Sequence, residues 1–331
     1  MTICVTGSSG HLGEGLMRSL RAQGRGAIGI DLLPGAFTDR VGNVCDRAFL
    51  CDALAGADCV IHAATLHKPH VATHGRQAFV DTNVTGTLAL LEAALAEGVG
   101  RFVFTSTTST FGSALVPPPG APAAWIDEDV VPVPKNIYGA TKIAAEQLCE
   151  LFARQHGLPL VVLRTGRFFP EEDDDPAVRA ARSRDNAQVN ELLHRRADLA
   201  DVVQAHLLAA ERAPALGFGR YIVSASTPFC RGDLAALRQD PMAVVERLVP
   251  GTVALYARLG WTLPAIDRVY DNARAVRDLG WRPAHGFAQA MQAVAAGEEF
   301  RSDLAQAVGA KGYHPAPFDL AGPYPTDWPP A

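Results

Sequence analysis

Tyr138 and Lys142 stand four positions apart in the segment Tyr138-Gly-Ala-Thr-Lys142. On a helix, two residues at this spacing lie on one face, one turn apart. A cation beside a phenol favours the phenolate, so we expect Lys142 to lower the pKa of Tyr138 from its usual value of about 10. Tyr138 would then act as a general acid or base on an alcohol or carbonyl group. The pair alone is a weak signal and needs support from elsewhere in the chain.

A glycine-rich turn near the N-terminus gives that support. Gly7, Gly10 and Gly13 join a short apolar strand to a helix. Glycines let the backbone approach a pyrophosphate, and the helix N-terminus favours its charge, so we expect a dinucleotide here rather than only a tight turn. Asp31 ends the second predicted strand, 24 positions after Gly7. A carboxylate there accepts hydrogen bonds from an adenosine ribose and repels a 2′-phosphate, which predicts NAD rather than NADP; the alternative is a turn or cap residue.

Composition narrows the class of protein. The chain has 331 residues, 48% of them hydrophobic and 20% charged, with a formal net charge of -5. This charge gives no general footprint for nucleic acid, and the apolar runs are too short to span a membrane. The six cysteines show no metal-ligand spacing, so we expect no metal site and a reducing compartment, the cytoplasm.

The first half of the chain alternates between strand and helix patterns. This alternation predicts an α/β fold, a Rossmann-type doubly wound parallel sheet, with a smaller, mainly helical C-terminal substrate lobe. We expect an NAD-binding core over 1–165, a substrate lobe with interleaved core elements over 166–300 and a proline-rich tail over 301–331. Strands are predicted at 3–5, 27–30, 59–61, 101–104 and 160–163, and helices at 12–20, 84–96 and 138–157.

Over about residues 1–295 the sequence resembles the extended short-chain dehydrogenase/reductase family, of the NAD-dependent epimerase/dehydratase type. The matching segments are Thr6-Gly-Ser-Ser-Gly-His-Leu-Gly13, Asp58-Cys-Val-Ile-His-Ala-Ala64, Asn83-Val-Thr-Gly-Thr87, Phe104-Thr-Ser-Thr-Thr-Ser-Thr-Phe-Gly112 and Tyr138-Gly-Ala-Thr-Lys142.

The resemblance implies a role for each matched residue. Thr107 would hold the substrate oxygen while Tyr138 moves its proton and Lys142 binds the nicotinamide ribose. Thr108 is the rival of Thr107, because a register slip of one residue exchanges them. The residues implied to bind NAD are Gly7, Ser9, Gly10, His11, Leu12, Gly13, Asp31, Asn43, Val44, His62, Ala63, Ala64, Asn83, Thr105, Tyr138 and Lys142.

The substrate side is less well defined. The segment from Arg164 to Glu171 is similar to that of uronate dehydrogenases, which oxidise free sugar acids, and it suggests Arg167 as a clamp for a carboxylate or phosphate. The alternative is an ion pair between Arg167 and the acidic run at 171–175. His67 and Thr108 are the other expected substrate contacts. Asp201 follows Pro170 by only 31 positions, which is short for wrapping a nucleotide diphosphate.

We expect an NAD-dependent enzyme that transfers hydride at a secondary alcohol of a sugar or sugar derivative. A dehydrogenase would release NADH, whereas a nucleotide-sugar epimerase, like UDP-glucose 4-epimerase, would retain NAD and return the hydride. Dehydratases of the family carry acidic residues where this chain has Thr108 and Ser109, so dehydration loses support. A non-catalytic dinucleotide sensor is a further alternative. The resemblance also implies a homodimer, paired through the helices that contain Leu88 to Leu95 and Ile143 to Leu151.

Overall fold

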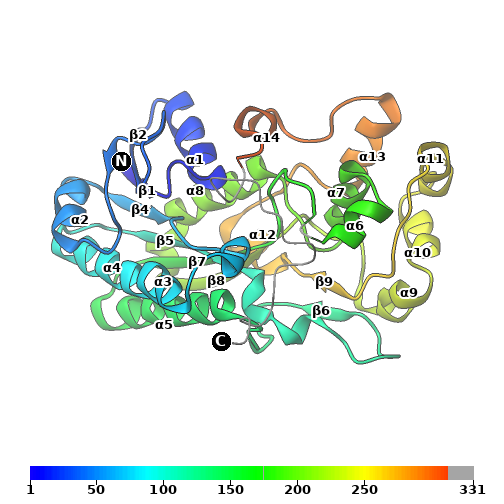
Figure 1. The fold of residues 1–331 in the computed structure, drawn as a ribbon, viewed down its shortest axis with the longest axis horizontal. Helices are drawn as coiled ribbons and strands as arrows, with labels where there is room; N and C mark the ends of the chain where they lie inside the picture. Colours follow the sequence, from blue (N-terminus) through cyan, green and yellow to red (C-terminus); the bar gives the residue numbers. More distant parts are fainter. Residues whose placement is uncertain (174, 312–331) are drawn as a thin grey trace.

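Seven parallel strands form the central sheet of the protein, in the order β3-β2-β1-β4-β5-β7-β8 (Figure 1). The structure is a computed structural model that describes residues 1–173 and 175–311. The chain builds outward from β1 to β3 and then crosses back to β4 on the other side of β1, which makes a topological switch point there. The strands are β1 (Thr2–Thr6), β2 (Gly26–Asp31), β3 (Arg40–Val41), β4 (Cys59–His62), β5 (Phe102–Thr107), β7 (Leu160–Thr165) and β8 (Phe218–Val223).

Helices cover both faces of this sheet, which confirms the predicted Rossmann-type fold (Figure 1). Leu12, Leu16 and Leu20 repeat at helical spacing in the first helix and are buried against one face of the sheet. That face carries α1 (His11–Ala22), α8 (Leu199–Leu216), α12 (Ala273–Leu279) and α14 (Asp303–Val308), and the other carries α2 (Arg47–Leu54), α4 (Gly86–Ala96) and α5 (Ile137–His156).

A smaller lobe with its own apolar core packs beside the carboxyl ends of the strands. Its two-stranded parallel sheet joins β6 (Ala124–Ile126) to β9 (Arg268–Tyr270), two segments far apart in the chain. The lobe helices are α6 (Pro176–Ala181), α7 (Arg184–Leu192), α9 (Leu234–Gln239), α10 (Pro241–Leu248), α11 (Thr252–Leu259) and α13 (Phe287–Ala296). The lobe is thus mainly helical, as expected, but the strands β6, β8 and β9 were not predicted from the sequence.

Short helical turns connect these elements at the edge of the sheet where the strands end. Helix α3 (Arg76–Val80) runs into a π-helical turn, η2 (Asp81–Thr85), and then into α4. The remaining turns are η1 (Lys68–Ala72), η3 (Thr108–Phe111), η4 (Ser113–Leu115) and η5 (Arg231–Asp233).

The predicted C-terminal tail begins with regular structure. Residues 303–308 form α14, whose Ala305 and Val308 are buried against the sheet layer. The proline-rich last twenty positions, 312–331, lie outside the described residues. Within residues 1–173 and 175–311, no helix combines the length and the apolar character needed to cross a membrane.

Candidate active site

A cavity of ≈ 830 Å³ lies at the carboxyl ends of the strands, beside the switch point. Loops that follow β1, β2, β4, β5 and β7 line it, and the lobe contributes further residues. This is where ligands bind in open α/β sheets, and the volume lies within the range usual for ligand pockets. Most of the residues that the sequence analysis selected meet on its walls.

The glycine turn forms a cradle that side chains would fill. Gly7 has a φ of 75°, and a Cβ on it would lie 2.7 Å from the backbone nitrogen of Ala64. A Cβ on Gly13 would lie only 1.9 Å from the carbonyl oxygen of Gly7. Helix α1 begins at His11 directly after this turn, so its free amide groups face the cradle. The turn therefore leaves room for a pyrophosphate.

The adenosine side of the cavity is formed by the ends of β2 and β3. Asp31 lines the cavity, and its carboxylate accepts hydrogen bonds from the backbone N–H groups of Ser9 (2.9 Å) and Leu33 (3.0 Å). Asn43 and Val44 also line it, and the Asn43 side chain caps the N–H of Cys45 at 2.9 Å. The carboxylate of Asp31 is thus fixed at the position expected for a ribose contact.

Ser9, Gly10, His11 and Leu12 line the cavity from the glycine turn, and Ala63, Ala64 and Thr105 line it from the ends of β4 and β5. His62 is a correction, because its side chain lies in the core rather than on the wall. Its ring bonds Thr6 Oγ1 (2.7 Å) through Nδ1 and Thr87 Oγ1 (3.1 Å) through Nε2. Burial, together with the charge of Lys142, lowers the pKa of His62 to about 3.

Asn83 also lies outside the cavity wall, within the π-helical turn η2. Its side-chain amide donates to the carbonyl of Leu66 (2.9 Å) and to Thr141 Oγ1 (3.1 Å), and its oxygen accepts from the N–H of Leu66 (2.9 Å). Asn83 therefore ties the loop after β4 to α5 and does not face the space for the cofactor.

Thr107 and Tyr138 meet on the cavity wall. Thr107 is the last residue of β5 and Tyr138 lies in the first turn of α5, and the Thr107 hydroxyl lies close enough to the phenol to influence its pKa. Thr108 and Ser109 follow in η3 and also line the cavity. The structure brings Thr107, rather than Thr108, to the phenol of Tyr138.

The expected lowering of the Tyr138 pKa is wrong. Burial raises the pKa of Tyr138 to about 12, and only the nearby Thr107 hydroxyl acts in the other direction. Lys142 lies one turn further along α5, buried, with its Nζ 4.0 Å from the centre of the Phe104 ring. Burial lowers the pKa of Lys142 to about 7. Lys142 is also absent from the cavity wall, because its ammonium packs against this ring.

A buried ion pair, which the sequence analysis missed, lies behind Lys142. Glu146 follows Lys142 by one turn and accepts hydrogen bonds from Ser106 Oγ (2.5 Å) and Arg164 Nη2 (2.7 Å). Both partners are at least 95% buried. Glu146 thereby links α5 to β5 and β7 and fixes the helix that carries Tyr138.

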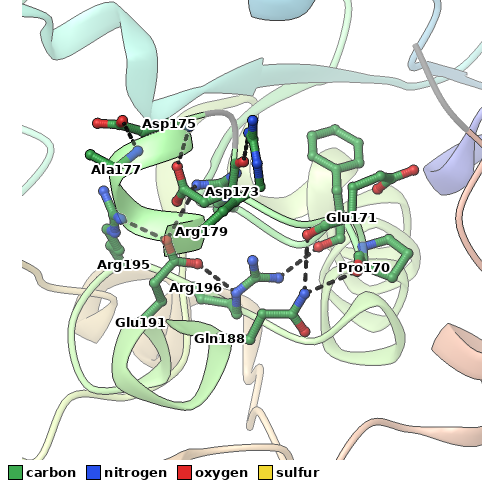
Figure 2. Close-up of polar contacts among 12 residues, drawn as sticks. Pro170, Glu171, Asp173, Asp175, Ala177, Arg179, Gln188, Glu191, Arg195 and Arg196 are labelled. Carbon is green, nitrogen blue, oxygen red and sulfur yellow. Dashed lines mark hydrogen bonds and ion pairs between the residues drawn. The ribbon is translucent and has the colours of Figure 1, made fainter. Parts of the chain in front are cut away.

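His67 and Arg167 line the substrate end of the cavity. The Arg167 guanidinium donates to Asp173 at 2.6 Å and lies 3.4 Å from Glu191. The structure therefore shows the ion pair with the acidic run. Glu191 itself lies between Arg195 and Arg196, as Figure 2 shows.

The cavity wall also includes residues that were not predicted, among them Arg195, Arg268, Tyr270 and Lys311. The Lys311 N–H donates to Glu171 Oε1 at 3.0 Å, and its ammonium contacts Glu14 at 2.5 Å. Glu171 also bonds His11 of the glycine turn, at 2.6 Å. These residues come from segments that the fold brings together, and no local pattern marks them.

Comparisons with known proteins decide the family. A model described as the NAD dependent epimerase/dehydratase family matches residues 3–220. The chain belongs to this family. It is of the extended short-chain dehydrogenase/reductase type, as the sequence segments indicated, and the glycine cradle and Asp31 fit NAD.

Two relatives illustrate the range of the family. The chain is 34% identical over 184 residues to a dTDP-glucose 4,6-dehydratase of Streptomyces niveus. This alignment covers 50% of this chain and 53% of the relative. It is 34% identical over 171 residues to a UDP-glucose 4-epimerase of Rhizobium meliloti (strain 1021). This alignment covers 49% of this chain and 50% of the relative. The chain thus spans about half the length of these relatives.

Among solved structures, a short-chain dehydrogenase/reductase superfamily protein from Agrobacterium tumefaciens with bound NAD aligns with a TM-score of 0.63. The two chains are 25% identical, and the alignment covers 89% of this chain and 96% of that one. MoeE5, in complex with UDP-glucose and NAD, aligns with a TM-score of 0.62 at 23% identity. The alignment covers 88% of this chain and 96% of that one.

The role of Asp31 in this family member gives a first prediction. The double variant Asp31→Ala/Leu32→Arg removes the carboxylate and adds a guanidinium that can pair with a 2′-phosphate; Leu32 is exposed and lines the cavity. We expect the ratio of kcat/KM for NAD to that for NADP to fall by about 100-fold. Steady-state kinetics with both cofactors measure this ratio. An unchanged preference would show that Asp31 does not contact the ribose.

Proposed function

We propose that this protein is a dehydrogenase that oxidises a secondary alcohol of a sugar or sugar derivative. The observation that carries the proposal is that Thr107 and Tyr138 lie together on the wall of a cavity whose other end is the glycine cradle. The hydride acceptor for such an oxidation is the chemistry that NAD supplies when bound. The residues of the chain then have to hold the alcohol and move its proton.

Each residue has a distinct task in this scheme. The Thr107 hydroxyl orients the substrate oxygen toward Tyr138, and the Tyr138 oxygen takes the hydroxyl proton in oxidation or returns it in reduction. Because the pKa of Tyr138 is about 12, the phenol is protonated at neutral pH. The phenolate fraction rises about tenfold per pH unit below that pKa, so oxidation should become faster toward alkaline pH. Glu146 and Arg164 keep the Tyr138 helix in place.

Dehydration fits the site less well than oxidation does. Thr108 and Ser109 occupy the two positions after Thr107 and line the cavity, so neither offers a carboxyl group to expel water from a sugar. Epimerisation is the second candidate, and the UDP-glucose 4-epimerases among the relatives favour it. The short segment between Pro170 and Asp201 favours a small substrate, and therefore oxidation.

The test is NADH absorbance with purified protein, NAD and a panel of uronic acids, aldoses and UDP-sugars, followed by product analysis. The proposal expects NADH to accumulate with one substrate and the matching keto or lactone product to form. A flat trace with an isomerised sugar would establish the epimerase instead. Tight NAD binding without turnover of any sugar would favour a dinucleotide sensor.

The expected partner, besides a carbohydrate, is a second copy of the chain. Helices α4 and α5 pack together on one face of the sheet (Figure 1), and Leu88, Leu95, Ile143, Leu148 and Leu151 on them remain partly exposed. Pairing of these helices with those of a second copy would cover this apolar surface. Analytical ultracentrifugation should find the mass of a dimer at micromolar concentration, and a pure monomer would refute the pairing.

A further inference from the structure

The substrate end of the cavity carries more arginines than the sequence analysis assigned to it. Arg167, Arg195 and Arg268 all line it, and they come from the segment after β7, the turn after α7 and strand β9. We propose that Arg268, assisted by Arg195, forms a binding subsite for an acidic group on the sugar substrate. This inference rests on the proposed carbohydrate oxidation and names the class of sugar involved.

Backbone hydrogen bonds fix the three arginine segments to one another. The N–H of Arg167 donates to the carbonyl of Arg195 at 3.2 Å, and the N–H of Tyr270 donates to the carbonyl of His194 at 2.9 Å. The ring of His194 also contacts the carbonyl of Arg268 through Nδ1, at 3.0 Å. The positions of the arginines are therefore set by the fold, as a preformed binding site requires.

Arg167 and Arg195 already have anionic partners inside the protein. Arg167 donates a hydrogen bond to Asp173 at 2.6 Å. Arg195 forms an ion pair with Glu191 at 2.6 Å, as Figure 2 shows. Arg196, which is buried, bonds the other oxygen of Glu191 at 2.7 Å. These arginines are held by ion pairs with carboxylates of the protein itself. Arg167 is therefore not the main residue to bind an anionic group of the substrate.

Arg268 has a weaker partner and keeps more of its hydrogen-bonding capacity. Its Nη1 donates to Asp267 at 3.0 Å, and Asp267 is 36% exposed, so solvent screens this pair. Its side chain also contacts Tyr270, which lies on the cavity wall. The Nε of Arg268 has no hydrogen-bond partner among the described residues. A guanidinium has five N–H donors, so Arg268 has donors left for a ligand.

The electrostatic balance of this region favours an anion. Among the described residues, three guanidiniums, those of Arg195, Arg196 and Arg268, lie beside two carboxylates, those of Glu191 and Asp267. Burial and the positive charges of Arg195 and Arg268 hold the pKa of His194 well below its usual range, so the ring stays neutral and adds no charge. A half-buried guanidinium in such surroundings is stabilised by a carboxylate or phosphate that binds in its fork geometry.

The test compares acidic with neutral sugars. Wild-type protein, Arg268→Met and Arg268→Lys are assayed with NAD and D-glucuronate, D-galacturonate, hexose phosphates, UDP-glucose and the neutral parent hexoses. We expect an acidic sugar to be the best substrate and Arg268→Met to lower its kcat/KM by about 10- to 100-fold, mainly through KM. Arg268→Lys should restore part of this loss. The acid class that responds to Arg268 distinguishes a carboxylate from a phosphate.

The matched control is Arg277→Met, which removes an exposed guanidinium that pairs with Asp278 on α12, away from the cavity. It should behave as wild type, and NAD affinity should be equal in all the variants. Equal turnover of acidic and neutral sugars, or an Arg268→Met variant with unchanged kcat/KM, would overturn the subsite. If wild type oxidises no sugar, the proposed function fails. Calorimetric titration of wild type and Arg268→Met with D-glucuronate and glucose phosphate then decides the subsite alone, since only wild type should bind one of them.

Discussion

Tyr138→Phe should lower kcat by about 10²- to 10⁴-fold, the range contributed by a positioned general acid or base. The substitution removes the hydroxyl beside Thr107 and leaves the ring, which packs with Val71 and Phe79 in a small apolar cluster. The glycine cradle and Asp31 are untouched, so NAD binding should persist. Stopped-flow or steady-state kinetics on the best substrate, with NAD affinity from fluorescence titration, separate these two effects.

The matched control for this variant is Tyr256→Phe. The Tyr256 hydroxyl is also buried and donates to Asn190 at 2.8 Å, but it lies in the core of the lobe. We expect Tyr256→Phe to lose some stability and to keep kcat. If Tyr138→Phe turned over at close to the wild-type rate, proton transfer through Tyr138 would be excluded.

Lys142→Met should make the protein more stable and much less active. The pKa of Lys142 is about 7 in the folded state, against 10.5 for the unperturbed group, because the ammonium is buried. The unfolded chain therefore binds more protons between these two values, and stability rises with pH across that window. Below about pH 7 the full cost of burying the charge is present. Methionine has a similar shape and no charge, so it avoids this cost.

The expected result is a Tm about 5 °C higher than wild type at pH 6, measured without NAD, and a difference that shrinks as the pH approaches 10. Comparison across pH is the internal control, because a pure packing effect would not depend on pH. A Tm equal to or below that of wild type at pH 6 would show that the contact with Phe104 and the attraction to Glu146 outweigh burial. We also expect kcat/KM to fall by about 100-fold or more, because the contact with the nicotinamide ribose that the family resemblance implies for Lys142 is lost.

The residues that local sequence could predict are those whose role depends on the backbone near them. Gly7 and Gly13 are required by a turn of seven residues, and the structure shows the close approaches that exclude a Cβ. Asp31 lies at the end of a predicted strand, and it faces the cavity as expected. The spacing of Tyr138 and Lys142 likewise placed both residues on α5.

The spacing of residues in the sequence does not show how deeply their side chains are buried. The helical repeat predicts that Tyr138 and Lys142 share a face, but burial decides their pKa values, and it raises one and lowers the other. His62 ends β4 next to two residues that line the cavity, yet its own ring points toward Thr6 and Thr87. Side chains alternate along a strand, so a one-residue difference moves a group from the wall to the core.

The arginines of the substrate end were beyond sequence reasoning for a different reason. Arg195 and Arg268 are 73 positions apart, and they meet because β9 pairs with β6 and hydrogen-bonds the segment at His194. Neither strand has more than three residues, which is too short for a clear alternating pattern. Arg167 was the one arginine that a resemblance could select, and its guanidinium pairs with Asp173.

The most direct test of the proposed oxidation uses the best sugar substrate with deuterium on the alcohol carbon. The protein is incubated with NAD, and mass spectrometry locates the deuterium in the reduced cofactor and in the sugar. We predict that the deuterium leaves the sugar and appears in released, reduced cofactor in equal amount to the oxidised product. Deuterium that stays in an isomerised sugar, with no net cofactor reduction, would contradict a dehydrogenase and identify an epimerase.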